Sequence, residues 1–255
     1  MTPFSVTTIG TGNALPDATR GPTSQLIRYG EASIVVDLGS GALQKIARAG
    51  VHVHDLDALV LTHAHIDHIA DMLPLLFALS VLKIQRERPL DIYTSEKTLG
   101  YVRGVQAVFG AWLQASEGNV RWHVIAPQQA HVVAGLTMHT GTVQHTESSV
   151  ALRFDAPDGR KLAIPGDTAP HAPLHDFVRG VNALVIECGN PSGVENDVHL
   201  SPQSLAELLQ DAQPAKAIVT HTPLELSDDE IHAAVKPAFR GSLIIPADLD
   251  TIDVA

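Results

Sequence analysis

Residues 59–72, LVLTHAHIDHIADM, bring three histidines and an aspartate into six consecutive positions directly after an apolar run. His63 and His65 lie two residues apart, so both side chains can face the same way in an extended or turning segment. Asp67 and His68 then begin a helix-like segment and can point to a neighbouring spot. Because imidazole and carboxylate suit Zn²⁺, and also Mn²⁺ or Fe²⁺, this spacing predicts ligands for two divalent metal ions.

A polar loop with Asp67 capping the next helix would explain a single histidine at this place, so the metal hypothesis needs further ligands. Ligands gather beyond the carboxyl ends of strands in α/β sheets, and the chain offers polar residues at such ends. Four more candidates lie just past a predicted strand or at the start of a predicted helix: His145, Asp167, His199 and His221. Their positions favour a metal site over the polar loop.

Short apolar runs alternate with helix-like segments along the whole chain. The predicted strands are rich in Val, Ile and Leu, are bounded by Gly, Pro or Asp, and cover residues 5–10, 25–30, 33–39, 58–62, 90–94, 120–126, 136–143, 149–155, 161–166, 183–188, 216–221 and 242–247. Helix-like patterns cover 40–50, 69–83 and 201–212, and the last begins with a Ser N-cap followed by Pro. DAPDGR at 155–160 is typical of a hairpin turn. We expect an α/β fold with helices outside the sheets, in a single domain over residues 1–255.

The composition restricts the partners. The formal net charge is −11, with 17 Lys and Arg against 28 Asp and Glu. Tight binding to a large nucleic acid depends on basic residues that neutralise phosphates, so such a partner is disfavoured, although metal ions would add positive charge. No apolar run is long enough to span a membrane, and the N-terminus lacks the pattern of a signal peptide. Cys188 is the only cysteine, which excludes an internal disulfide, and we expect a cytoplasmic protein without a membrane partner.

The motif HAHIDH, followed in order by His145, Asp167 and His221, resembles the signature of the metallo-β-lactamase superfamily. The resemblance covers nearly the whole chain. It includes the opening TIGTGNALP loop and VDLGSG at 36–41, where Asp37 matches the acidic residue before the signature strand. It implies a four-layer αββα sandwich, in which two mixed β-sheets are flanked by helices.

Within that superfamily the sequence is most similar to the ribonuclease Z and small-phosphodiesterase branch. The similarity rests on the GTG loop, on GDT with Asp167, on HLSP with His199 and on THTP with His221. It implies a site with two divalent ions, zinc first among them, bridged by Asp167. The implied ligands of one ion are His63, His65 and His145, and those of the other are Asp67, His68 and His221. Glu187 would orient His199, and Asp37 would support the ligands in the same way.

Two neighbouring ions would share a hydroxide whose pKa they have lowered, and that hydroxide would attack an electrophile. We expect a phosphodiesterase for small or cyclic phosphodiesters, with Asp67 and His199 as its catalytic side chains. His199 would protonate the leaving group or stabilise its charge. The bridging Asp167 argues against the β-lactamases proper. The 22 residues from His145 to Asp167 leave no room for the arm that transfer-RNA-processing members insert there.

Other functions remain open at this stage. The same hydroxide would open a lactone or a thioester, and the apolar run at 72–82 would then wall an acyl pocket, although it suits a core helix equally well. Ribonuclease Z-type RNA processing and a non-catalytic metal-binding protein rank lower, because of the charge and because no expected ligand is missing. Members of the branch tend to pair, so a homodimer acting on a small-molecule substrate is expected.

Several other residues have simpler explanations. His52 and His54 also form an HxH pair, but no DH follows and the context is a loop before a strand. His171 and His175 are close enough to GDT in the sequence to edge the pocket. We expect Cys188 to be a small buried residue and not a nucleophile, because no histidine partner can be assigned to it.

Overall fold

The strands of the chain form two seven-stranded mixed sheets in a computed structural model that describes residues 1–81, 86–114 and 118–255. The first sheet has the order β14-β1-β2-β3-β4-β5-β6, and the second β13-β12-β11-β10-β9-β8-β7. The strands of the first sheet are β1 Phe4–Gly10, β2 Ser24–Tyr29, β3 Ala32–Val36, β4 Ala58–Val60, β5 Leu90–Thr94, β6 Val120–Val124 and β14 Thr251–Asp253. Those of the second sheet are β7 Ala130–Val133, β8 Leu136–Gly141, β9 Ala151–Asp155, β10 Lys161–Ile164, β11 Ala183–Glu187, β12 Lys216–Thr220 and β13 Ser242–Ile244.

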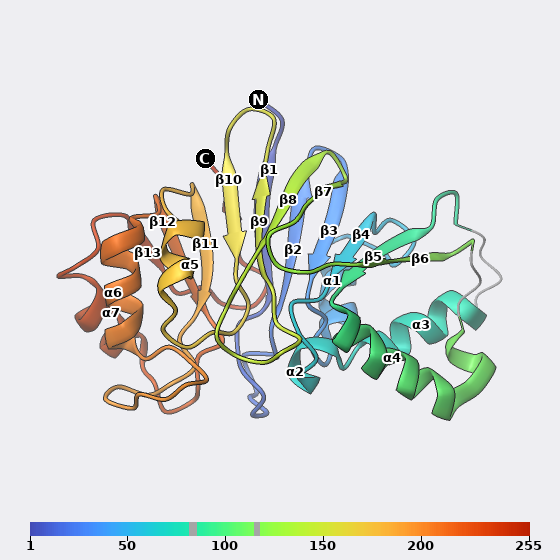
Figure 1. The fold of residues 1–255 in the computed structure, drawn as a ribbon, viewed down its shortest axis with the longest axis horizontal. Helices are drawn as coiled ribbons and strands as arrows, with labels where there is room; N and C mark the ends of the chain where they lie inside the picture. Colours follow the sequence, from blue (N-terminus) through green and yellow to red (C-terminus); the bar gives the residue numbers. More distant parts are fainter. Residues whose placement is uncertain (82–85, 115–117) are drawn as a thin grey trace.

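Helices cover the outer faces of both sheets (Figure 1). On the side of the first sheet lie α1 Ala42–Arg48, α2 Ile66–Ile69, α3 Met72–Val81, α4 Glu96–Phe109 and the 3₁₀ helix η1 Gly110–Leu113. On the side of the second sheet lie α5 Ala172–Phe177, α6 Pro202–Ala212 and α7 Asp228–Val235. The arrangement confirms the expected four-layer αββα sandwich. None of the helices among the described residues is long and apolar enough to cross a bilayer.

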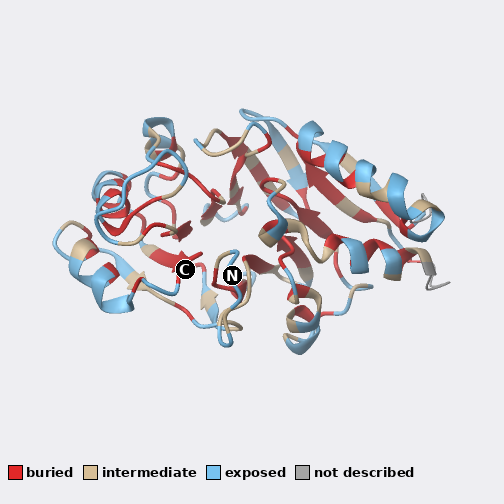
Figure 2. Ribbon diagram, turned by 90° about the horizontal axis from the view of Figure 1, so that it is seen from below, coloured by how far each residue is buried: buried red, intermediate tan, exposed pale blue. Residues whose placement is uncertain are grey.

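Three apolar cores hold these layers together. The central core joins the two sheets through side chains such as Val36 from β3 and Leu152 from β9. One outer core packs the first sheet against its helices, and the other packs the second sheet against α5, α6 and α7. Figure 2 shows the buried residues concentrated on the strands and on the inner sides of the helices. Burial of apolar surface on both faces of both sheets is therefore the main stabilising contribution, and it leaves the strand ends free for polar residues.

Each predicted strand is present, with ends that differ from the prediction by a few residues. The edge strands β7 and β14 were not predicted, because most of their side chains are exposed or half-buried and their sequences hold no long apolar run. The hairpin turn is confirmed between antiparallel β9 and β10. There Gly159 has a φ of 91° and donates its N–H to the carbonyl of Ala156 at 2.9 Å, a backbone conformation that glycine adopts without strain.

The helix predicted over 69–83 is wrong at its start. A short helix, α2, ends at Ile69, and α3 begins at Met72. The carboxylate of Asp71, between them, accepts the N–H groups of Gly41 and Leu43 at 3.0 and 2.9 Å, at the start of α1. Residues 82–83 of the prediction lie outside the described part of the chain. The predicted start of α6 is confirmed, because Ser201 and Ser204 form a capping box with proline at the first helical position.

Cys188, next to Glu187 at the end of β11, is fully buried, as expected. Burial raises the pKa of its thiol well above the ordinary value, and the charge of Glu187 adds to the effect. Thiol reagents attack the thiolate, so the native protein should not react with 5,5′-dithiobis(2-nitrobenzoic acid), whereas one thiol per chain should react in guanidinium chloride. Rapid labelling of the native protein would contradict this packing.

Candidate metal centre

Strands of both sheets deliver the candidate ligands to one edge of the sandwich. His63 follows β4 of the first sheet, and His145, Asp167 and His221 follow β8, β10 and β12 of the second. β10, β11 and β12 are parallel, and β9 is antiparallel to both β8 and β10. The carboxyl ends of β8, β10 and β12 therefore lie on the same side, where they meet the end of β4.

The helix α2 carries two further candidates to this edge. Its N-cap is His65, so Asp67 does not cap the helix as the polar-loop explanation requires. Asp67 instead points its carboxylate at His221, with 3.3 Å between Oδ2 and Nε2. Gly39 allows this approach, because a Cβ at residue 39 would lie 2.4 Å from the carbonyl oxygen of Asp67.

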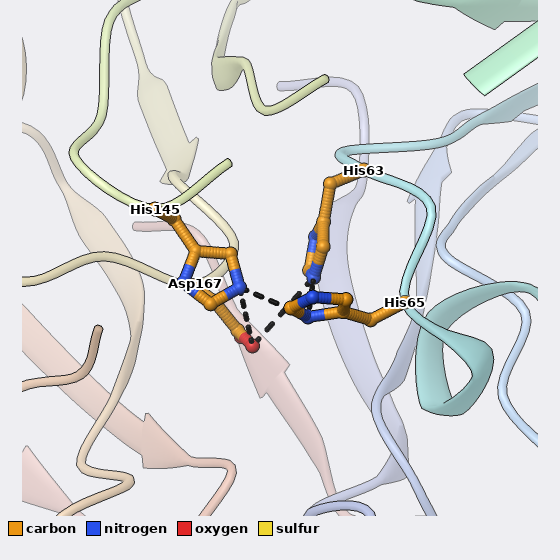
Figure 3. A group of neighbouring side chains, drawn as sticks. All are labelled: His63, His65, His145 and Asp167. Atoms are coloured by element: carbon orange, nitrogen blue, oxygen red, sulfur yellow. Dashed lines mark hydrogen bonds and ion pairs between the residues drawn. The ribbon is translucent and has the colours of Figure 1, made fainter. Parts of the chain in front are cut away.

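Three imidazoles converge on one point of the edge, as Figure 3 shows. Nδ1 of His65 lies 3.1 Å from Nε2 of His63 and 3.0 Å from Nε2 of His145. Oδ2 of Asp167 lies 3.7 Å from Nε2 of both His63 and His145. One ligand atom of each of these four residues lies within 4.8 Å of the others, which gives a candidate set of three nitrogens and one oxygen.

A second group shares the same aspartate. Asp67, His68 and His221 also place one ligand atom each within 4.8 Å of one another. Oδ2 of Asp167 lies 3.3 Å from Nε2 of both His68 and His221. The single oxygen Oδ2 of Asp167 therefore faces both groups, which is the geometry that a bridging ligand requires.

These groups have the chemistry of a metal site. His65 can donate only one proton from Nδ1, so it cannot satisfy the nitrogens of both His63 and His145, whereas a cation between the three satisfies all of them. Nε2 of His68 is buried and makes no hydrogen bond within the described residues, although Oδ2 of Asp167 is 3.3 Å away. Tetrahedral zinc bound by nitrogens at about 2.1 Å holds its ligand atoms about 3.4 Å apart, close to the spacing seen here.

The electrostatics support the same interpretation. Burial lowers the pKa of His63 well below its ordinary value and that of His145 to about 4, so both rings are neutral at pH 7, as metal ligands must be. Burial alone would raise the pKa of Asp167, but His221 and His68 hold it well below its ordinary range. Burial alone would lower the pKa of His68, but Asp167 and Asp37 raise it well above the ordinary value, so His68 would have to release a proton when it binds a metal ion.

Oxygen atoms behind the ligands orient the imidazole rings. Oδ2 of Asp37 accepts hydrogen bonds from Nδ1 of His68 and from the Thr62 hydroxyl, each at 2.7 Å. The Thr62 hydroxyl in turn lies 3.0 Å from Nδ1 of His63. These contacts fix which nitrogen of each ring faces the cluster. Gly166 allows the close packing, because a Cβ there would lie 2.8 Å from the side chain of Thr62.

Two contacts behind the ligands were not predicted from the sequence: that of Thr62, and that of the carbonyl of Val198, which lies 2.9 Å from Nδ1 of His145. Thr62 directly precedes His63, and alternation along a strand would place the two side chains on opposite faces, so the pattern gave no signal for their contact. The sequence holds no signal for Val198, because any residue supplies the same carbonyl oxygen.

His199 lies beside both groups and remains partly open to solvent, with 22% of its side chain exposed. Its Nδ1 is 2.9 Å from Oε1 of Glu187 and 4.0 Å from Oδ2 of Asp167. Burial alone would lower the pKa of His199, but Glu187 and Asp167 raise it above its ordinary value. A partly exposed imidazole held by a carboxylate is suited to proton transfer. His199, Asp167 and His221 also form a third set with ligand geometry.

Other histidines lie outside the cluster. His171 is the N-cap of α5 and contacts the Thr142 hydroxyl at 2.9 Å, and His175 pairs with Asp211. Within the described residues, neither joins a group with ligand geometry, and nor do His52 and His54. The structure thus brings together the predicted ligands and leaves these alternatives apart.

An αββα sandwich with this cluster at its edge is the architecture of a metal-dependent hydrolase, and comparisons with known proteins agree. Residues 33–222 match the Beta-lactamase superfamily domain, so the chain belongs to the metallo-β-lactamase superfamily. The relatives found for it in that superfamily are metal-dependent hydrolases. A curated relative, "Ribonuclease Z" of Mycobacterium sp. (strain KMS), is 29% identical over 277 residues, which cover 98% of this chain and 96% of that protein.

Solved structures show the same fold. The metallo-β-lactamase fold protein YhfI from Bacillus subtilis superposes with a TM-score of 0.87 at 22% identity, covering 99% of this chain and 100% of YhfI. A diphosphatase from the PhnP family has a TM-score of 0.74 at 18% identity, covering 99% of this chain and 97% of that protein. At these identities the similarity establishes the architecture and leaves the substrate open.

Proposed function

We propose that the protein is a phosphodiesterase that binds two divalent metal ions and hydrolyses small or cyclic phosphodiesters. The observation that carries this proposal is the position of Asp167, whose Oδ2 lies 3.3 to 3.7 Å from ring nitrogens of both ligand groups. Zinc suits the donor set, which consists of imidazole nitrogens and carboxylate oxygens.

The chain's own residues divide the work around the bound ions. When bound, two neighbouring ions lower the pKa of a water molecule and stabilise the charge that develops on a phosphate. Asp67, on α2, lies 3.3 Å from His221 and keeps 12% of its side chain exposed, and we assign it a catalytic role together with its role as a ligand. Glu187 holds His199 by Nδ1, and His199 then supplies a proton or positive charge to the leaving oxygen.

Two features support a small substrate. The interval from His145 to Asp167 is filled by β9, β10 and their hairpin turn, so no arm for an RNA extends from it. The net charge of −11 also opposes binding of a polyanion. Ribonuclease Z-type RNA processing is nevertheless an activity to test, because curated relatives carry that name. Lactone or thioester hydrolysis is the other alternative, because two ions would activate the same water for an acyl substrate.

The proposal is tested by comparing four substrates with the same zinc-loaded preparation: bis(p-nitrophenyl) phosphate, a lactone, a thioester and a transfer-RNA precursor with a 3′ extension. We expect diester cleavage that chelation abolishes and added zinc restores. Preferential cleavage of the lactone or thioester, or of the RNA precursor, would overturn the assignment in favour of that activity. A protein that binds metal and cleaves none of the four would contradict the enzymatic role.

We also propose that the protein forms a homodimer through an apolar surface on α3, α4 and η1. Large apolar side chains are exposed on these helices to 45–82%, among them Phe77, Val108, Phe109 and Trp112. The rings of Phe77 and Trp112 lie together, with 6.2 Å between their centroids. Exposed apolar side chains that lie close together, as Phe77 and Trp112 do, are typical of interaction sites.

Sedimentation equilibrium should therefore give twice the chain mass of 27.1 kDa, and Trp112→Glu should shift the protein to the monomer. Val132→Glu, at a valine on the edge strand β7 that is exposed to 78%, is the matched control and should leave the dimer intact. A monomeric wild type, or a Trp112→Glu variant that still pairs, would refute the proposed interface.

A further inference from the structure

A small polar cavity lies beneath the ligand cluster, between the two sheets. It leaves about 10 Å³ for the centre of a water molecule, close to the least that one ordered water needs. Its walls include Gln25 from β2 and His221 from the end of β12, together with Asp37 and Glu187. A cavity with such walls is suited to water, since an empty cavity in a protein is normally apolar.

Gln25 has an unsatisfied side chain in this cavity. The residue is 1% exposed, and in the sheet it pairs with Val36 on one side and Thr8 on the other. Side chains alternate along a strand, so Gln25 faces the same way as Ile27, which packs in the core between the sheets. Neither its amide nitrogen nor its amide oxygen has a hydrogen-bond partner within the described residues. Buried amides are almost always hydrogen-bonded, so this one requires a partner.

His221, which also lines this cavity, has an unsatisfied ring nitrogen. Its Nε2 faces the ligand cluster, 3.3 Å from Oδ2 of Asp67 and from Oδ2 of Asp167. Its Nδ1 is buried and, among the described residues, has no hydrogen-bond partner. The rings of four other cluster histidines each place Nδ1 next to an oxygen atom: His63, His68, His145 and His199. His221 lacks the support that normally fixes a ligating ring.

We infer that one ordered water occupies the cavity, accepts the Nδ1–H of His221 and hydrogen-bonds to the amide of Gln25. Gln25 is then a positioning residue: through the water it keeps the proton on Nδ1 and leaves Nε2 of His221 free to bind metal. This inference rests on the proposed metal site, and it adds a residue that none of the motifs contains. It gives a partner to Nδ1 of His221 and to one polar atom of the Gln25 amide with a single molecule that fits the cavity.

The test is Gln25→Met, which keeps the length of the side chain and removes its hydrogen-bonding atoms. Zinc affinity is measured by competition with a chromophoric chelator. We expect the affinity for one ion, the ion of the group with His221, to fall by about 10- to 100-fold, and the affinity for the other ion to stay the same. Thr94→Val is the matched control, because the Thr94 hydroxyl is also buried and lacks a partner within the described residues but does not line the cavity.

Wild-type affinity for both ions in Gln25→Met, or equal weakening in Thr94→Val, would overturn the inference. If Gln25→Met does not fold, a high-resolution crystal structure of the wild type decides. It should show one water within hydrogen-bond distance of both Nδ1 of His221 and the Gln25 amide, and an empty cavity would refute the inference. A wild type that binds no second ion would instead contradict the proposed metal site, so the two failures can be told apart.

Discussion

Replacing Asp167 with asparagine should reduce hydrolysis by about 10³-fold or more, because loss of the bridging charge removes several kcal/mol of metal-dependent stabilisation of the transition state. Oδ2 of this residue lies within 4.0 Å of ring nitrogens from five histidines. An amide carries no charge and offers one oxygen, so it cannot compensate for two cations. The variant should therefore also bind less metal per chain than the wild type.

Metal content by plasma mass spectrometry and turnover on one preparation check this prediction. Asp211→Asn is the matched control, because it makes the same change at an exposed carboxylate that pairs with His175 and Arg179. The control should keep both its metal and its activity. An Asp167→Asn variant that retains full metal content and wild-type turnover would contradict the bridging role.

The His199→Ala variant should lose about 10²- to 10⁴-fold in turnover, the usual contribution of a positioned acid or base, while it keeps both metal ions. The basis is that Nδ1 of His199 is already occupied by Glu187, at 2.9 Å, and that the side chain is partly exposed to solvent. His175→Ala is a suitable control, since that ring pairs with Asp211 outside the cluster.

The choice of leaving group separates the two roles considered for His199. A proton donor matters most when the leaving group is a poor one, so the loss in His199→Ala should be larger for an alkyl diester than for p-nitrophenyl diesters. Loss of a metal ion in the variant would show instead that His199 is a ligand, as the geometry of His199, Asp167 and His221 permits.

The sequence was informative about the site wherever a ligand directly follows a strand. His63, Asp167 and His221 each come within three residues of a buried apolar strand, so the local pattern alone predicted that they would lie at a sheet edge. The outer strands β7 and β14 were missed for the opposite reason. Their exposed positions lack the apolar pattern. β14 is defined by its pairing with the distant strand β1, and β7 by a tight hairpin with its neighbour β8.

Contacts behind the ligands were much harder to predict. Glu187 could be proposed because it stands at a strand end, and Asp37 because it matches the resembled family. The structure places them against His199 and His68. Gln25 gave no such signal, since a polar residue near the start of a strand normally faces solvent. Its burial follows from the packing of the second sheet over the first, which depends on residues more than 100 positions away in the sequence.

The most direct test of the two-ion site is anomalous X-ray diffraction at the zinc edge from crystals of the zinc-loaded protein. Two peaks should appear in each chain, both contacted by Asp167. One peak should lie among His63, His65 and His145, and the other among Asp67, His68 and His221. A single peak, or peaks elsewhere such as at His52 and His54, would contradict the proposal that these residues form a two-metal hydrolytic centre.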